Sequence, residues 1–234
     1  MAENVTKRFF TKKAALIVVG GFLLILLFAR NDSPAPAATS PSNSKVASST
    51  TNEEVEELGM HGIGESKTGV VLIEYGDFAS EASKAYQPMM QQIMDKYGDQ
   101  LRFVYRDFPV ESNATSMAAQ RSANAVEASQ GMFWRMRELL YERQAAWKDN
   151  PQAESMFESY AKELGVDMKQ YKQALASKSI SNAITTDIAS GQKLQVSTTP
   201  ALFINDKVVP ANITFDDLSK LIDEAIAANY KPAS

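Results

Sequence analysis

The chain has 234 residues, 44% of them hydrophobic and 22% charged, which is enough for one sizeable globular domain with appendages. Residues 1–30 carry a net charge of +4, so the remaining 204 residues carry −8. An acidic body repels phosphate backbones, which argues against a nucleic-acid partner. The sequence has no cysteine and one histidine, His61, which excludes disulfides, thiolate chemistry and multi-histidine metal sites. We therefore expect neither a metal nor a cofactor.

An apolar run near the N-terminus predicts a membrane anchor. Residues 14–29 (AALIVVGGFLLILLFA) follow four basic residues. As a helix this run spans about 24 Å, close to the ~30 Å hydrocarbon core of a bilayer. The basic flank favours an N-terminus inside the cell. We expect residues 1–30 to be a cytoplasmic flank and an uncleaved transmembrane signal-anchor, with the rest of the chain on the extracytoplasmic side of the cell membrane.

Two other interpretations of this run remain. A cleaved signal peptide needs small residues near its end, which residues 35–37 (Ala-Pro-Ala) would supply, although they lie beyond Arg30 and Asp32. A buried core helix is disfavoured because the run has no amphipathic face. A lipoprotein anchor is excluded because no cysteine follows.

The segment after the run is a predicted linker. Residues 31–52 consist almost entirely of Ser, Thr, Pro, Ala and Asn. Such a composition buries too little apolar surface to offset the entropy of ordering. We expect a disordered linker over 31–57 and a folded domain over 58–232, with a helical insertion at about 111–195.

The first elements of this domain predict a βαβ unit. Residues 70–75 (VVLIEY) are typical of a central strand buried on both faces. Residues 80–97 have helical spacing, with a kink expected at Pro88 and Gly98 as the terminator. Residues 101–108 (LRFVYRDF) predict a second strand, joined to the first by a right-handed crossover.

Helices and a hairpin follow. Helical periodicity covers 114–129, 132–147 and 180–194. Shorter helices are marked by Asn150 as N-cap with Pro151 at the first helical position, by a stop near Gly165, and by Asp167 as the next cap. Residues 201–204 and 207–209 predict a hairpin, and Thr214 with Asp217 resembles a capping box that opens a helix over 215–229. Periodicity thus indicates an α/β domain with a helical insertion and goes no further.

Five separated segments resemble the DsbA-like family of thiol:disulfide oxidoreductases, in the same order along the chain. They are 61–64 (HGIG), 70–90 (VVLIEYGDFASEASKAYQPMM), 102–109 (RFVYRDFP), 123–140 (ANAVEASQGMFWRMRELL) and 196–205 (VSTTPALFIN). The resemblance covers about residues 58–230. It implies a thioredoxin-like fold (β-α-β, helical insertion, β-β-α) and protein disulfide bond formation.

The resemblance also implies a site. In the family a Cys-x-x-Cys motif opens the first helix, and the positions of its cysteines are Ser80 and Ser83 here. A helix N-terminus stabilises the attacking thiolate, and the second cysteine resolves the mixed disulfide. A serine hydroxyl stays protonated at neutral pH and forms no exchangeable bond to sulfur. We therefore expect the chain to be redox-inactive.

Three further positions carry over from the family. Thr199 and Pro200 correspond to a cis-proline loop whose backbone holds an extended peptide, and Glu74 to a buried acid that relays protons. The residues alone allow simpler interpretations: Ser80 as an ordinary N-cap, Glu74 as an edge residue facing water, and a trans Pro200. A His61–Ser80 hydrolase pair is disfavoured because no Gly-x-Ser-x-Gly elbow is present.

Two functions compete. The first is a disulfide oxidoreductase whose two cysteines are replaced by serine. The second is a naturally redox-dead module that binds peptides at the loop of Thr199 and Pro200, with a structural envelope protein as a third reading. The resemblance implies unfolded or reduced secreted proteins as peptide substrates and a redox partner in the membrane, while the acidic charge of the domain argues against nucleic acid.

Overall fold

The computed structural model describes residues 61–109 and 114–229. The expected anchor (1–30) and linker (31–57) lie outside these ranges. Among the residues that are described, no helix is both long and apolar enough to cross a membrane.

A five-stranded mixed sheet forms the centre of the domain, in the order β1-β3-β2-β4-β5. The strands are β1 (His61–Ile63), β2 (Val70–Gly76), β3 (Leu101–Asp107), β4 (Ala201–Ile204) and β5 (Lys207–Val208). Only β2 and β3 pair in parallel, and all seven residues of β2 are buried, as expected for a central strand. The sequence did not predict β1, which adds to the edge of the sheet by pairing with β3.

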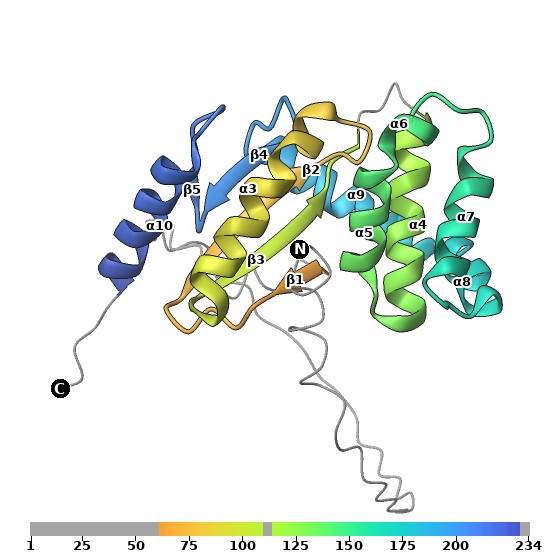
Figure 1. The fold of residues 1–234 in the computed structure, drawn as a ribbon, viewed down its shortest axis with the longest axis horizontal. Coiled ribbons are helices and arrows are strands. Elements are labelled where there is room, and N and C mark those ends of the chain that lie inside the picture. Colours follow the sequence, from red (N-terminus) through yellow and green to blue (C-terminus); the bar gives the residue numbers. More distant parts are fainter. Residues whose placement is uncertain (1–60, 110–113, 230–234) are drawn as a thin grey trace, which may run out of the picture. The chain divides into compact units, whose positions relative to one another are not determined.

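Helices cover both faces of this sheet (Figure 1). On one face lie α3 (Glu81–Tyr97), which connects β2 to β3, and α10 (Phe215–Asn229). Their apolar side chains, among them Ile93 and Leu218, pack against Leu72 of β2. The alternate side chains of β2 point to the other face, where α9 (Lys178–Lys193) lies against β3. Each fully buried aliphatic side chain contributes about 1.5–3 kcal/mol through removal of apolar surface from water.

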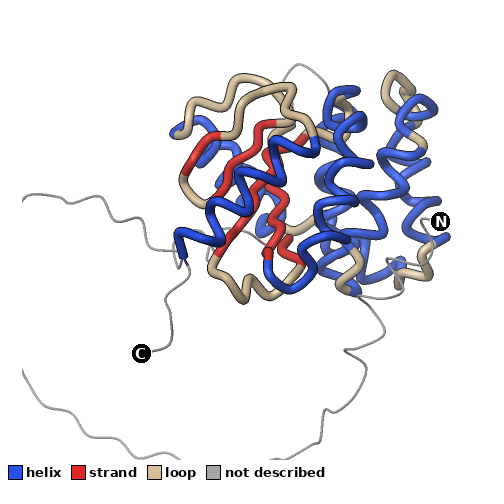
Figure 2. The backbone as a smooth tube through the Cα atoms, turned by 60° about the vertical axis from the view of Figure 1, so that its left-hand side comes forward, coloured by secondary structure: helices blue, strands red, loops and turns tan. Residues whose placement is uncertain are grey.

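The remaining helices form a separate group beside the sheet (Figure 2). They lie between β3 and β4 in the chain: α4 (Ala114–Gln130), α5 (Phe133–Glu142), α6 (Gln144–Trp147), α7 (Ala153–Glu163) and α8 (Met168–Leu175). They enclose a second core that includes Phe133, Trp147 and Phe157, all at most 1% exposed. The structure therefore shows the expected thioredoxin-like α/β fold with a helical insertion.

Two predicted helix boundaries are wrong. The helix expected over 132–147 is interrupted at Arg143, which separates α5 from α6. Asn150 is not an N-cap, because α7 begins at Ala153, after Gln152. The Asn150 side chain instead accepts a hydrogen bond from the Gln152 N–H at 2.8 Å and forms a local turn.

Two predicted caps are confirmed. The Asp167 carboxylate accepts from the N–H groups of Lys169 and Gln170 and opens α8. The Thr214 hydroxyl accepts from the Asp217 N–H and donates to its carboxylate, which opens α10. These motifs act within one turn of helix, so the sequence is enough to find them.

Candidate active site

The first turn of α3 is organised by its own side chains. Ser80 is the N-cap of the helix, and its hydroxyl accepts a hydrogen bond from the Ser83 N–H at 3.1 Å. Before it, the Asp77 carboxylate accepts from the Ala79 N–H (2.8 Å) and from the Ser116 hydroxyl of α4 (2.5 Å). The turn that contains Ser80 is therefore fixed by the cap of α3 after it and by the hydrogen bonds of Asp77 before it.

The loop before β4 meets this turn. The Thr199–Pro200 peptide bond is cis, as the resemblance implies. The Ser80 hydroxyl donates to the Thr199 carbonyl oxygen at 3.1 Å, so residues 119 positions apart in the sequence are in contact. Ser80, Thr199 and Pro200 are half-buried, whereas Ser83 is fully buried and its hydroxyl has no described partner. The structure thus brings four of the five expected site residues together.

Gln144 of α6 also holds the turn, and the sequence did not point to it. Its side-chain amide donates to the carbonyl oxygens of Phe78 (2.7 Å) and Ser80 (2.9 Å). The side chain is buried, so these carbonyls would otherwise lie unsatisfied in the interior. Gln144 therefore couples the helical insertion to the residue at the N-terminus of α3.

Glu74, the fifth expected site residue, is fully buried in β2, so the edge-strand interpretation is wrong. One carboxylate oxygen accepts a hydrogen bond from Arg137 of α5 at 2.9 Å. Burial raises the pKa of Glu74, and the Arg137 charge opposes that shift. The Gln87 side chain of α3 also lowers the pKa of Glu74. The second carboxylate oxygen of Glu74 has no hydrogen-bond partner among the described residues, so Gln87 acts on it as a nearby dipole and not through a hydrogen bond.

His61 is engaged away from Ser80, which removes the basis for a hydrolase pair. Its Nε2 lies 3.1 Å from the Asn124 side-chain oxygen, and its ring stacks on Phe133 at a centroid distance of 3.5 Å. Burial lowers the pKa of His61 to about 4, so the ring is neutral at pH 7.

A second buried polar group surrounds Asn124. Its amide donates to the Asp107 carboxyl at 2.7 Å, and the Asp107 N–H donates to the Asp187 carboxyl at 3.0 Å. Arg106 pairs with Asp187 at 2.9 Å. Burial raises the pKa of Asp187 to about 6. Burial also raises the pKa of Asp107 well above its usual range, and the negative charge of Asp187 adds to that shift. This group links β3 to α4 and α9 and reaches none of the expected site residues.

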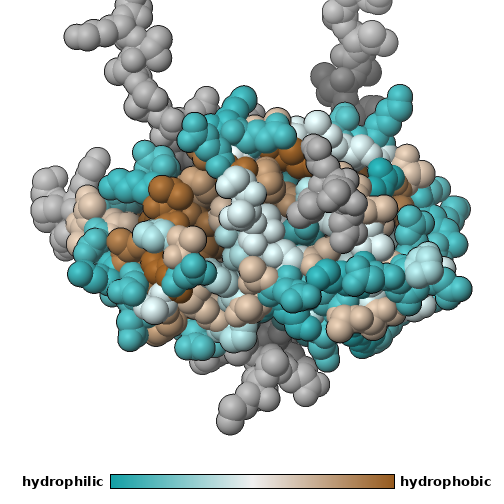
Figure 3. Space-filling view, turned by 90° about the horizontal axis from the view of Figure 1, so that it is seen from above, coloured by the Kyte–Doolittle hydropathy of each residue, from teal (hydrophilic) through white to brown (hydrophobic). Residues whose placement is uncertain are grey.

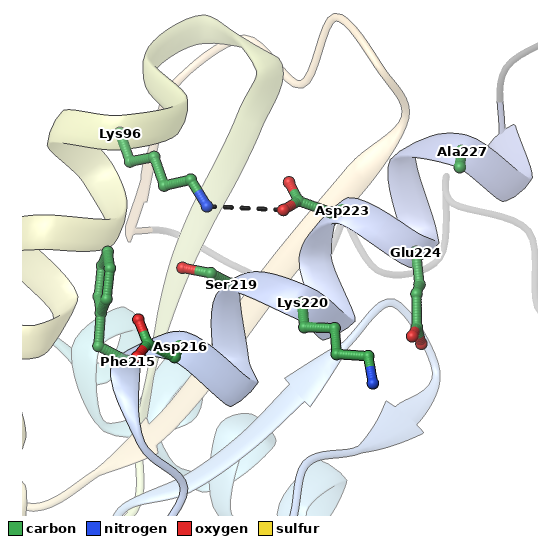
Figure 4. Close-up of a pocket in the computed structure, with 8 residues that line it drawn as sticks. All are labelled: Lys96, Phe215, Asp216, Ser219, Lys220, Asp223, Glu224 and Ala227. Atoms are coloured by element: carbon green, nitrogen blue, oxygen red, sulfur yellow. Dashed lines mark ion pairs between the residues drawn. The ribbon is translucent and has the colours of Figure 1, made fainter.

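A shallow pocket of about 470 Å³ lies elsewhere, between the C-terminal end of α3 and α10 (Figure 4). Lys96 and Asp223 line it and form an ion pair at 3.5 Å. Lys96 stands at the opposite end of α3 from Ser80, which the helix rise places roughly 24 Å away. Within the described ranges, no three His, Asp or Glu side chains gather as metal ligands.

The surface around the N-terminal end of α3 is mixed in polarity. This end points upward in Figure 1, and Figure 3 views the molecule from that side. Hydrophobic residues gather there in patches separated by polar ones.

Arg137 and Gln144 are the two site residues that sequence reasoning missed. Arg137 carried a signal: it falls four residues after Phe133 and three before Leu140, on the apolar stripe of its helix. A charge on that stripe predicts a buried partner. Gln144 carried no such signal, because its role depends on how α6 meets the turn before α3.

Together, the parallel β2–α3–β3 unit, the helix N-terminus at Ser80 and the facing cis-proline define a DsbA-like thioredoxin fold. A family model described as thioredoxin matches residues 56–224. The chain therefore belongs to the thioredoxin family, in its DsbA-like form, with serine at both cysteine positions.

Two kinds of curated relative are similar to the chain. A probable disulfide bond formation protein D from Bacillus cereus is 26% identical over 182 residues, which cover 75% of this chain and 82% of that protein. The Na(+)/H(+) antiporter NhaA 1 from Mycolicibacterium vanbaalenii is 30% identical over 148 residues, 62% of this chain. The chain spans only about a quarter of the antiporter's length, since the match covers 23% of it.

Solved structures agree on the fold. Oxidised BdbD from Bacillus subtilis superposes with a TM-score of 0.65 at 19% identity, covering 73% of this chain and 94% of BdbD. The thiol-disulfide exchange protein alpha-DsbA2 from Wolbachia pipientis gives a TM-score of 0.63 at 18% identity, with 74% and 92% covered.

Proposed function

We propose that the chain is a membrane-anchored, extracytoplasmic thiol-disulfide oxidoreductase of DsbA-like type that is redox-inactive because serine occupies positions 80 and 83. One observation carries the proposal: the Ser80 hydroxyl lies at the N-terminus of a long helix, 3.1 Å from the Thr199 carbonyl beside a cis-proline. A helix N-terminus favours an anion, so a thiol at position 80 would ionise readily.

With cysteine at both positions, the site would carry out disulfide formation in two exchanges. A substrate thiolate attacks the sulfur at position 80 of the 80–83 disulfide, which releases the thiolate at position 83. A second thiolate of the substrate then attacks the substrate sulfur of the mixed disulfide, which breaks its bond to the sulfur at position 80 and releases that sulfur as a thiolate. The substrate leaves with a disulfide, and the two electrons remain on the thiols at 80 and 83. We propose unfolded or reduced secreted proteins as the substrates, and a redox partner in the membrane that reoxidises the pair.

The test compares the chain with its Ser80→Cys/Ser83→Cys variant by glutathione redox titration. We expect a reversible two-electron couple and oxidation of a reduced test protein in the variant, and neither in the parent. The matched control is Ser177→Cys/Ser179→Cys, which places a dithiol at the N-terminus of α9, where these hydroxyls lie 2.5 Å apart. If the 80/83 variant folds but oxidises substrate no better than this control, the proposal is wrong.

A second function is favoured by the hydrogen bonding of Ser80. Its hydroxyl both accepts from the Ser83 N–H and donates to the Thr199 carbonyl, so the hydrogen bonds of Ser80 are formed without sulfur. This arrangement suits a redox-dead module that binds extended peptides at Thr199 and Pro200. Such a module would bind peptides from a panel of unfolded secreted proteins, and Pro200→Ala would abolish that binding. No measurable affinity for any peptide would rule this function out.

A further inference from the structure

We propose that Arg137 is a positioning residue of the Ser80–Ser83 site: its guanidinium keeps Glu74 as a fixed carboxylate near Gln87 of α3, so that Glu74 does not relay protons. This inference rests on the proposed function, because it assigns Arg137 and Glu74 their roles within the Ser80–Ser83 site. It changes the role of Glu74 from a proton relay to one half of a permanent ion pair.

The pair is buried and closely coupled. The Arg137 side chain is 9% exposed, that of Glu74 is 0% exposed, and their N and O atoms are 2.9 Å apart. Four aromatic rings surround the guanidinium carbon at 5.3–5.6 Å, those of Phe103, Tyr105, Trp134 and Tyr141. Aromatic faces attract a cation, and more strongly where water is absent. The aromatic rings around Arg137 therefore stabilise its charged form.

A charged arginine in this place requires a charged Glu74. Arginine does not lose its proton in proteins, so a protonated Glu74 would leave an uncompensated buried cation. Such an unpaired charge costs more than the desolvation of one partner in an existing pair. Burial raises the pKa of Glu74, but the permanent positive charge of Arg137 lowers it, which favours the ionised carboxylate.

Among the residues that the structure describes, Arg137 is the charged group that acts on the ionisation of Glu74. From β3, Tyr105 stands opposite it in register, and Tyr141 lies on α5; burial raises the pKa of both phenols, so both are neutral. From β4, the facing residue is the apolar Leu202. From α3, the uncharged Gln87 acts on it. Arg137 is the cation that sets the ionisation of Glu74.

Gln87 connects the pair to the site. Its amide donates to the Ser83 carbonyl at 2.8 Å while its dipole lowers the pKa of Glu74. A carboxylate of constant charge attracts the Gln87 amide in the same way throughout. The hydrogen bond from Gln87 to the Ser83 carbonyl therefore keeps one geometry. A carboxylate that changed charge during a reaction would release that arrangement.

The inference is tested on the full chain by carbon-13 NMR of its glutamate carboxyl groups, with the Glu74 signal assigned as the one lost in Glu74→Gln. We expect Glu74 to stay ionised between about pH 6 and pH 8 in the parent and in Arg137→Lys. In Arg137→Met its pKa should rise by about one unit or more, so that a protonated fraction appears in this range. The matched control is Arg135→Met on the same helix, whose side chain is 39% exposed and pairs with Glu138 at 3.9 Å.

Two outcomes would overturn the inference. One is a protonated Glu74 in the parent at pH 7, which decides the matter even if Arg137→Met fails to fold. The other is an unchanged Glu74 titration in a folded Arg137→Met.

A second readout separates this inference from the proposed function. In the Ser80→Cys/Ser83→Cys background, Arg137→Met should add a second inflection to the thiol titration, because Glu74 then changes charge next to Gln87, whose amide bonds the carbonyl of residue 83. A redox-silent double-cysteine variant would reject the proposed function and leave the NMR result standing. An active variant without the added inflection would reject the inference alone.

Discussion

At the scale of single residues, the Ser80 hydroxyl has a structural role that can be measured without any thiol chemistry. Ser80→Ala removes the acceptor for the Ser83 N–H and the donor to the Thr199 carbonyl. Loss of an N-cap costs about 0.5–2 kcal/mol, and the lost contact to the loop adds about 1 kcal/mol. We expect a total loss of about 2 kcal/mol in the free energy of unfolding, measured with urea.

The control for this prediction is another serine N-cap. Ser177 caps α9 by accepting from the Ser179 N–H at 3.0 Å and lies outside the site. Ser177→Ala removes this cap and an exposed hydroxyl contact to Ser179 within the same turn. Among the residues that the structure describes, it removes no contact to another element, so it should cost less than Ser80→Ala. Equal losses in the two variants would mean that the contact between Ser80 and Thr199 contributes no stability.

The buried His61 predicts a pH dependence of stability. Its pKa is about 4 in the folded protein and 6.5 for a solvent-exposed histidine in the unfolded chain, so between these limits the unfolded chain binds more protons. The contribution of His61 is therefore present above about pH 6.5 and is lost as the pH falls to about 4, by about 3 kcal/mol. His61→Gln should remove this loss, as measured by urea unfolding at several pH values.

Asp187 acts in the opposite direction. Its pKa rises from 3.8 to about 6 on folding, so its contribution is present at low pH and is lost as the pH rises through 6. The two groups therefore partly cancel in the pH dependence of the parent's free energy of unfolding. The contribution of His61 is obtained from the difference between the parent and His61→Gln. A variant curve parallel to that of the parent between about pH 4 and pH 6.5 would show that His61 titrates normally when folded.

At the scale of elements, the short helix α6 holds the turn before α3. Gln144→Ala leaves the carbonyls of Phe78 and Ser80 without their buried donor, which costs about 1–3 kcal/mol. We expect faster amide hydrogen exchange in residues 78–84, without a change in α7 or α8. Gln170→Ala, at an exposed position of α8, should leave exchange at 78–84 unchanged. Uniformly faster exchange in the Gln144 variant would instead indicate a global loss of stability.

Elements were predictable where their signals are local. The caps at Asp167 and Thr214 are formed within one helical turn, and β2 follows from an unbroken apolar run. The break at Arg143 and strand β1 were not predictable in this way. Strand β1 has three residues and exists through its pairing with β3, which is a tertiary contact.

At the scale of the whole molecule, the site also combines residues that the sequence could indicate with residues that only tertiary contacts reveal. Ser80, Ser83, Thr199 and Pro200 follow from the resemblance, and the structure places them together. The side chains that brace them come from the helical insertion, whose position against the sheet no local pattern encodes. The resemblance therefore named the positions that the structure brings together, while the side chains that hold them could be found only from the arrangement of the two cores.

The last prediction concerns the proposed anchor. Residues 14–29 are apolar and follow a basic flank, which favours a spanning helix with the domain outside. We expect the full chain to stay in the membrane fraction after alkaline carbonate extraction and to be digested by protease added outside. A chain without residues 1–52 should be released as a folded domain whose melting temperature lies within about 2 °C of the full chain, since the core contacts lie beyond the linker. The mass of the N-terminus tests the alternative: a mature chain that begins just after residue 37 would show a cleaved signal peptide, whereas an intact N-terminus in the membrane fraction supports the anchor.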